Sequence, residues 1–339
     1  MRVGFNPQKD KVQEESRYLH QVIIPVYIPS QEGYFKDSFA ILKLCLESLF
    51  NTIHNKTFIT IINNGSDQIV SHYLDSLLEE KKIHELIHTE NIGKLNAVLK
   101  GLAGHNIELV TISDADVMFL PNWQMETVKV FKAIAKAGVV GIVPQFKMYE
   151  SNCGNVLFDT LLSAKLQFIP VKNKDALIRF YDSIGWDRNY NQDYLAYNLA
   201  LEISAGLTVL IGSGHFVATY KKDVFETIIS YNNYKMGGNS EGYLDTVPLE
   251  KDYWRVTTQD NYAYHMGNCI EDWMIEEVSK LEKPDQILDF KLETTQCNAK
   301  WLYFFKTKLF GKFILNKKIM TFFLIWKGLT KEEAKNYLK

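Results

Sequence analysis

The sequence has few cysteines and no excess of charge of either sign. Its four cysteines, Cys45, Cys153, Cys269 and Cys297, are widely scattered, and none forms the C-x-x-C pair typical of zinc or redox sites. The formal net charge is −2, whereas nucleic-acid-binding domains carry a basic excess. We therefore expect reduced structural thiols and no nucleic-acid partner.

Long apolar runs are absent as well. Residues 1–7 contain no apolar stretch of signal-peptide length, and no segment supplies the uninterrupted apolar span of a membrane helix. The hydrophobic content of 46% is that of a globular protein that can bury a substantial core. The expected compartment is the cytoplasm.

Short apolar runs alternate with segments of helical periodicity. Strands are predicted at residues 22–27, 58–62, 86–88, 109–112 and 207–211, and helices at 38–49, 69–80 and 94–102. Because apolar strands that alternate with helices form a parallel sheet covered on both faces, the sequence predicts an α/β fold with a mostly parallel sheet. Ligands of such sheets bind beyond the carboxyl ends of the strands, where the polar clusters 63–66, 91–94 and 114–116 are expected.

Two aspartates follow the predicted strand at 109–112. Asp114 and Asp116 are separated by Ala115, and both carboxylates are expected to project from the end of the strand. A cation site that leaves positions open for substrate phosphates usually offers one or two carboxylates. The pair is therefore a candidate Mn²⁺ or Mg²⁺ site, and the alternative is that Asp114 caps a turn while Asp116 is solvated.

The order of these motifs along the chain resembles family 2 glycosyltransferases. The first strand ends in Pro25-Val26-Tyr27, Asn63-Asn64-Gly65-Ser66 follows the second, and Asn91-Ile92-Gly93-Lys94 precedes Asp114-Ala115-Asp116. The match covers residues 20–145 well and continues more loosely to 270. It implies a GT-A fold and a nucleotide-diphospho-sugar donor that is bound by Pro25, Tyr27, Asn63, Asn64, Asn91, Gly93, Lys94, Asp114, Ala115 and Asp116.

The turn from Asn91 to Lys94 resembles the family stretch beside the nucleotide. There a cation can approach the diphosphate, and the N-terminus of the following helix offers free amides. The alternative is an ordinary turn with a surface lysine, and Gly93 is needed in both cases. The G-x-x-x-x-G-K-[ST] pattern of a P-loop is missing, which excludes an ATPase of that class.

Candidate residues for the acceptor side lie further along the chain. Residues 212–216 resemble the glycine-containing strand that forms the acceptor floor in the family, which would place Gly214 and His215 beside the acceptor. A lone histidine is more often structural, so His215 is a secondary candidate.

The catalytic base is expected from residues 237–245, which occupy the place of an acidic family motif. Asp245 is preferred, Glu241 is the second candidate and Asp252 the third; the alternative is that these residues cap and solvate a polar loop. His265 lies where many GT-A enzymes bring a histidine to the metal or the diphosphate. It could equally be a packed core residue.

The C-terminal segment is basic and aromatic. Residues 301–330 contain no acidic residue, six lysines (Lys306, Lys308, Lys312, Lys317, Lys318 and Lys327) and many aromatic residues. That profile is typical of a segment at a membrane interface, and the alternative is a helix packed on the domain or on a second subunit of a homodimer.

These observations lead to a hypothesis about organisation and function. Residues 1–290 would form the GT-A domain, with a nucleotide-sugar half (20–145) and an acceptor half (146–290), and residues 291–339 a basic amphipathic extension. The expected activity is metal-dependent, inverting transfer to a saccharide or lipid-linked saccharide in surface polysaccharide synthesis, in the cytoplasm and peripherally on the inner membrane face. The alternatives are a sugar nucleotidyltransferase, although residues 28–34 have too few glycines and no arginine for one, and a non-catalytic sugar-binding protein of the same fold.

Overall fold

A computed structural model of the chain describes residues 3–12, 14–227, 229–237, 242–283, 289–292 and 300–338. The strands are β1 (His20–Val26), β2 (Thr57–Asn64), β3 (Glu85–Thr89), β4 (Leu109–Ser113), β5 (Val117–Phe119), β6 (Ala137–Gly141), β7 (Leu166–Pro170), β8 (Tyr197–Ser204), β9 (Leu207–Ile211), β10 (Val217–Lys221), β11 (Trp254–Thr258) and β12 (Ala263–His265). The helices of the domain are α1 (Ser38–Thr52), α2 (Gln68–Glu79), α3 (Lys94–Leu102), α4 (Trp123–Ala133), α5 (Gly154–Thr160), α6 (Lys174–Ser183), α7 (Gly242–Glu250) and α8 (Asp272–Ser279).

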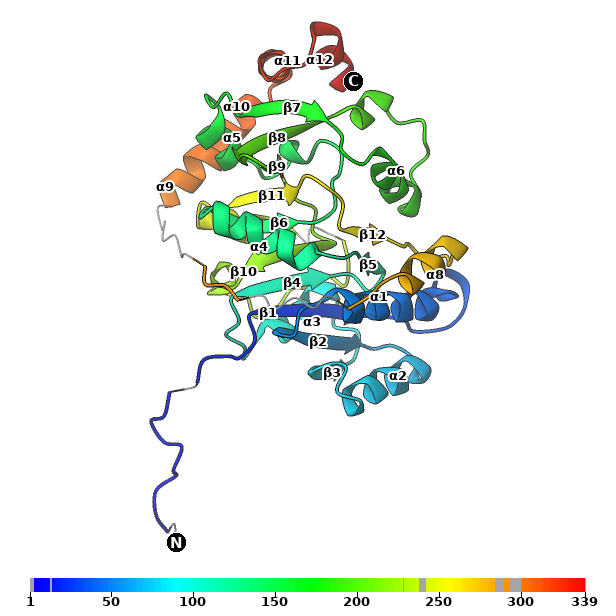
Figure 1. Cartoon of the computed structure of the whole chain (residues 1–339). Helices are drawn as coiled ribbons and strands as arrows, with labels where there is room; N and C mark the ends of the chain where they lie inside the picture. Colours follow the sequence, from blue (N-terminus) through cyan, green and yellow to red (C-terminus); the bar gives the residue numbers. More distant parts are fainter. Residues whose placement is uncertain are drawn as a thin grey trace.

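The central sheet is mixed: one half is parallel, and the other half is antiparallel except for the parallel pair β6 and β11. Its order is β3-β2-β1-β4-β10-β6-β11-β9-β8-β7, and β5 pairs with β12 in a separate two-stranded sheet (Figure 1). Strands β3, β2, β1 and β4 are parallel, as predicted, and β10 is antiparallel to both β4 and β6. The antiparallel strands β7, β8 and β9 extend the far edge.

Helices cover both faces of the parallel half. Because side chains alternate between the faces of a strand, Val22 and Ile24 of β1 pack in one apolar cluster with residues of α1, while Ile23 packs in another with residues of α3. This is why the strand is apolar along its length rather than at every second residue. The predicted strand and helix order through residue 113 is confirmed, and α3 has the predicted bounds.

The C-terminal segment packs on the domain in a series of short helices. These are α9 (Lys300–Tyr303), the π-helical turn η5 (Phe304–Phe310), α10 (Gly311–Ile314), α11 (Lys317–Trp326) and α12 (Lys331–Tyr337). Ile314, Phe323 and Leu324 are buried in one cluster with residues of β7, β8 and β9. The Phe168 amide donates to the Lys327 carbonyl at 2.8 Å, so the segment is also tied to the edge strand.

A buried ion-pair network fastens η5 to the domain. Lys306 Nζ lies 2.7 Å from both Asp159 Oδ1 and Asp252 Oδ2, and Lys136 Nζ contacts the same two carboxylates at 2.7 and 2.8 Å. Lys306 and Asp252 are almost fully buried. The network satisfies charges that would otherwise be costly to remove from water.

Removing Lys306 should therefore destabilise the chain. We expect Lys306→Met to lower the free energy of unfolding by about 3–5 kcal/mol, because the buried Asp252 carboxylate would be left with Lys136 alone. Urea unfolding measures this, and Lys308→Met, which alters an exposed lysine of the same turn, is the matched control. Equal stability of the two variants would contradict a fastening role for the network.

Among the described residues, no helix is both long and apolar enough to span a bilayer.

Candidate active site

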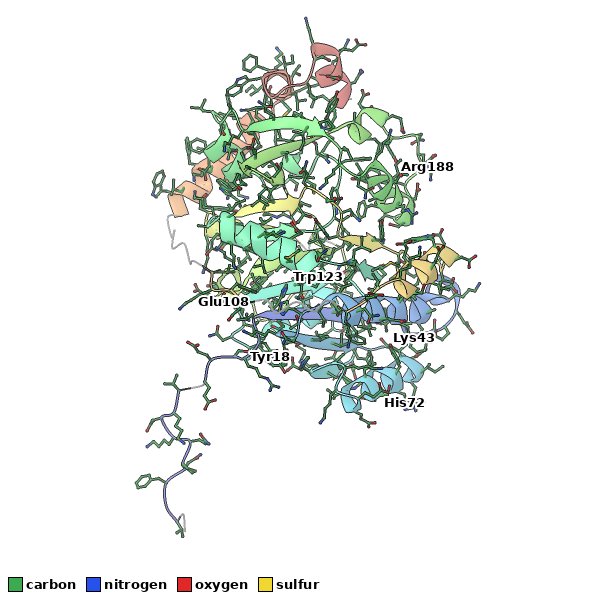
Figure 2. The ribbon with its side chains drawn as sticks, in the orientation of Figure 1. Tyr18, Lys43, His72, Glu108, Trp123 and Arg188 are labelled. Atoms are coloured by element: carbon green, nitrogen blue, oxygen red, sulfur yellow. The ribbon has the colours of Figure 1, made fainter. Side chains whose placement is uncertain are left out.

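A cavity of about 780 Å³, here called the edge cavity, lies at the carboxyl edge of the parallel strands. Eight residues singled out from the sequence line it: Pro25, Tyr27, Asn64, Lys94, Asp114, Ala115, Asp116 and His265. In Figure 2, Glu108 marks the amino end of β4. Arg188 lies in the direction in which β4 runs, toward the carboxyl ends of the parallel strands. The edge is where ligands of parallel sheets bind.

Asp114 and Asp116 occupy different environments within this cavity. Lys94 Nζ lies 2.6 Å from Asp114 Oδ1, so that carboxylate is already paired with a cation. Asp116 Oδ1 is buried and has no hydrogen-bond partner. Burial raises the pKa of Asp116, although the neighbouring His265 opposes the shift. Burying a carboxylate oxygen without a hydrogen-bond partner costs free energy. Asp116 is therefore a candidate metal ligand.

The small sheet of β5 and β12 brings His265 to Asp116. In its register His265 faces Val117, and the Met266 amide donates to the Asp116 carbonyl at 2.8 Å. His265 Nε2 therefore lies 3.4 Å from Asp116 Oδ2, while Nδ1 is 3.0 Å from Ser183 Oγ. The hydroxyl fixes the ring orientation, as an outer partner does for a ligating imidazole.

The side chains of Asp114, Asp116 and His265 fit a divalent cation whose remaining ligands come from the substrate. No group of three or more His, Cys, Asp or Glu side chains in the described part of the chain already surrounds a common point. However, the orphaned Asp116 oxygen, the Asp114 carboxylate and the His265 imidazole are of the types that Mn²⁺ accepts, and a Mg²⁺ site needs few protein ligands when phosphates supply the rest.

A second cavity, of about 380 Å³, adjoins the first. It is lined by Gln145, Phe146, Lys147, Met148, Ser151, Phe180, Ile184, Ser213, Gly214, His215, Phe216, Asp245, Arg255 and His265. His265 and Ile184 line both cavities, so these two residues form the junction between them. Gly214 and His215, the acceptor-side candidates, and Asp245, the preferred candidate for the base, all line this cavity.

Asp245 is carried by the first turn of α7, so the expectation of a polar loop is wrong for this residue. Its Oδ1 accepts a hydrogen bond from Arg255 Nη2 at 2.5 Å, and its Oδ2 lies 3.5 Å from His215 Nδ1. Arg255 is 2% exposed and also donates to the Ser213 carbonyl. The carboxylate is thus held in one orientation at the wall of the second cavity.

Three predicted donor-side residues, Asn63, Asn91 and Gly93, do not line either cavity. Asn63 is buried and its amide group is 2.8 Å from Ser71 Oγ and 3.0 Å from His88 Nδ1. Asn91 accepts from the Gly93 amide within its own turn. These side chains support the loops that carry Asn64 and Lys94 rather than facing the cavity.

Gly93 is required by the backbone. Its φ is +90°, and an added Cβ would lie 2.6 Å from the Tyr234 carbonyl oxygen. The same loop supplies the Lys235 carbonyl, which accepts from the Lys94 amide at 2.9 Å. The Lys94 amide is therefore not free to bind a diphosphate, and it is the Lys94 side chain that lines the cavity.

The remaining base candidates differ from Asp245 in position. Asp252 lies in the ion-pair network of Lys306 and lines neither cavity. Glu241 lies outside the described residues.

Several cavity residues were missed from the sequence. Arg255 had a signal, since an arginine within a strand as buried as Trp254–Thr258 is unusual unless a buried partner exists. Asp182, Ser183 and Ile184 lie in the predicted acceptor half of the domain, and nothing in their pattern specified which of their side chains line a cavity.

Distantly similar solved structures include two that hold a nucleotide sugar. One is S. aureus TarS 1-349 in complex with UDP-GlcNAc, with a TM-score of 0.44, 10% identity, and coverage of 94% of this chain and 70% of that one. Another is the mannosyltransferase PcManGT from Pyrobaculum calidifontis in complex with GDP-Man and Mn²⁺, with a TM-score of 0.43, 14% identity, and coverage of 96% and 76%. The chain covers 38% of a longer TarS structure at 12% identity and a TM-score of 0.43. No curated protein matches the sequence.

The sequence itself gives the firmer assignment. Residues 22–191, half of the chain, match glycosyl transferase family 2, and this span includes the parallel strands, Lys94 and the Asp114-Ala115-Asp116 motif. The architecture is the α/β sheet flanked by helices that the GT-A fold requires. The chain therefore belongs to glycosyl transferase family 2, the nucleotide-sugar-dependent glycosyltransferases.

Proposed function

We propose that this enzyme is a metal-dependent, inverting glycosyltransferase that binds its donor in the edge cavity and its acceptor in the second cavity. The observation that carries the proposal is the junction at His265. Through it, the cavity of Asp114 and Asp116 adjoins the cavity of Asp245, so that a donor and an acceptor bound in the two cavities would meet. Such positioning of two reactants is a large part of catalysis.

The donor is a nucleotide-diphospho-sugar. Tyr27 and Asn64 lie at the ends of β1 and β2 and line the cavity where the family binds nucleobase and ribose. The Asn64 side-chain oxygen accepts from the Ile92 amide, so its position depends on the turn that carries Lys94. Lys94 is the cation that can approach the diphosphate.

Asp114, Asp116 and His265 would hold Mn²⁺ or Mg²⁺ beside the diphosphate. When bound there, the ion supplies positive charge that stabilises the departing nucleoside diphosphate. Lys94, whose Nζ lies 2.6 Å from Asp114 Oδ1, would add a second positive charge beside the diphosphate. Ser183 keeps the His265 ring oriented.

Asp245 is the proposed general base. It takes the proton of the acceptor hydroxyl as the oxygen attacks the anomeric carbon on the face opposite the leaving diphosphate, which inverts that centre. The hydrogen bond from Arg255 holds the carboxylate in place. Phe180 and Phe216, which stack at 5.2 Å, give the second cavity an apolar wall suited to a sugar ring.

The proposed acceptor is a saccharide or lipid-linked saccharide of surface polysaccharide synthesis, modified in the cytoplasm at the inner membrane face. Cys45, Cys153 and Cys269 are unpaired, which is consistent with a reducing compartment. The second cavity shares only two lining residues with the edge cavity. This supports a separate binding site for the acceptor.

A screen of nucleotide sugars for metal-dependent hydrolysis tests this function. We expect one donor class to release nucleoside diphosphate with Mn²⁺ present, because water can replace the acceptor. Pyrophosphate release from a nucleoside triphosphate and a sugar phosphate would identify a nucleotidyltransferase instead. Donor binding without any turnover, with or without saccharide acceptors, would favour a non-catalytic sugar-binding protein.

A further inference from the structure

The C-terminal helices have two different faces. One face is buried against the domain and includes Ile314, Phe323 and Leu324. The other exposes large apolar side chains along its length: Trp301, Phe304, Phe305, Leu309, Phe313, Leu315, Phe322, Ile325 and Trp326. We call these nine side chains, with the exposed lysines among them, the aromatic face.

Helical spacing places several of these residues on the same side of their own helix. Trp301, Phe305, Leu309 and Phe313 recur every four residues from α9 to α10, close to the period of the π-helical turn between them. On α11, Phe322 and Trp326 are four residues apart and their rings stack at 6.4 Å. Trp301 is 68% exposed and Phe322 is 69% exposed, so packing on the domain leaves them in water.

The charge of this face is of one sign. Lys308, Lys312, Lys317 and Lys318 are exposed among the aromatic residues, and residues 300–330 contain no acidic residue. Lys306 and Lys327 do not contribute, because Lys306 is paired with Asp159 and Asp252 and Lys327 donates to the Ser163 carbonyl from a buried position. The surface therefore presents four lysines rather than the six in the sequence.

We propose that the aromatic face docks on the surface of an anionic lipid bilayer. Tryptophan and phenylalanine rings can enter the boundary between headgroups and acyl chains, while lysines contact anionic headgroups. The inference adds the docking surface to the proposed function and rests on that function only for the identity of the acceptor.

Charge favours a bilayer over a second copy of the chain. In a symmetric dimer built on this face, the same patch would meet itself, and four lysines from each copy would face one another without a carboxylate between residues 300 and 330. Anionic lipid supplies the missing opposite charge.

Docking by this face leaves the cavities accessible. No residue from the described part of the C-terminal segment, 300–338, lines the edge cavity or the second cavity. In Figure 1, α9 and α10 lie on the side of the molecule away from β5, β12 and α6, which carry or adjoin the junction at His265. Membrane binding and donor hydrolysis are therefore separable properties.

Co-sedimentation of the whole chain with vesicles tests the proposal. We expect binding to vesicles of phosphatidylcholine with phosphatidylglycerol and little binding to phosphatidylcholine alone. The fourfold variant Lys308→Gln, Lys312→Gln, Lys317→Gln and Lys318→Gln should bind roughly 600-fold more weakly, because each lysine near the surface contributes about a fivefold factor. Raising the salt from about 0.1 M to about 1 M should also release the wild type, since the screening length falls from about 10 Å to about 3 Å.

Two further variants keep the result decisive. Lys11→Gln, Lys81→Gln, Lys100→Gln and Lys132→Gln together remove the same charge from exposed positions elsewhere and should bind as the wild type does. Trp301→Ser with Phe322→Ser should weaken binding without changing the charge. Three results would overturn the proposal. The first is an equal loss of binding in both fourfold variants, and the second is binding that does not depend on anionic lipid. The third is no vesicle binding together with a dimer that the aromatic substitutions dissociate. Donor hydrolysis without vesicles should be unchanged in all of these variants, so a failure of docking is distinguishable from a failure of the proposed activity.

Discussion

Replacing Asp116 with asparagine is expected to lower Mn²⁺-dependent turnover of the nucleotide sugar by about 10²-fold or more. A bound divalent ion stabilises developing charge by several kcal/mol, and each 1.36 kcal/mol is tenfold in rate. Asp116 provides the buried oxygen that has no other partner and lies beside His265, so an amide there would remove the strongest candidate ligand. Initial rates over a range of Mn²⁺ concentrations measure the effect.

The same variant should remain folded. Burial raises the pKa of Asp116, which means that its ionised form opposes folding at pH values above that raised pKa. A neutral amide of the same shape removes this penalty, so the melting temperature at neutral pH should be equal or higher. Asp187→Asn, which alters an exposed carboxylate, is the control for both measurements. Wild-type turnover by Asp116→Asn would refute the assignment.

Replacing Asp245 with asparagine is expected to lower kcat by about 10²- to 10⁴-fold, the usual range for a lost general base. The affinity for the donor should be nearly unchanged, because Asp245 lines the second cavity and not the edge cavity. Single-turnover rates together with donor titration separate the two effects. Asparagine can still accept the hydrogen bond from Arg255, although the buried guanidinium loses its counter-charge.

Unchanged donor affinity also shows that the Asp245 variant is folded. The second candidate, Glu241, provides the comparison: if Glu241→Gln loses kcat while Asp245→Asn retains it, the base is Glu241 and Asp245 serves to position Arg255 and His215. Asp252→Asn should instead reduce stability, since Asp252 is paired with Lys136 and Lys306.

Local patterns were sufficient to predict the parallel half of the fold. The apolar run from Val22, the turn at Gly93 and the carboxylates after β4 are each encoded within a few residues, and the carboxyl ends of parallel strands necessarily meet at one edge. The prediction that Asp114, Asp116 and Lys94 lie together followed from topology alone, and their positions in the edge cavity agree with it.

Features that depend on distant pairing could not be predicted in this way. His265 reaches Asp116 through the β5–β12 register, and no local pattern specifies which short strands will pair across so many residues. The orientation of the Asn63 side chain is likewise set by its hydrogen bonds with Ser71 and His88, which hold it away from the cavities. For the C-terminal helices, composition indicated either packing on the domain or a role at a membrane interface, and the structure buries some of their apolar side chains and exposes others.

Binding of nucleoside diphosphates, followed by isothermal titration with and without Mn²⁺, tests the central claim most directly. The edge cavity is lined by the carboxylates of Asp114 and Asp116 together with His265 and Lys94, so the account predicts tight binding of one nucleoside diphosphate that requires Mn²⁺ in the wild type and disappears in Asp116→Asn. Binding that is equal with and without Mn²⁺, or that survives the substitution unchanged, would contradict the assignment of this edge as a metal-dependent donor site.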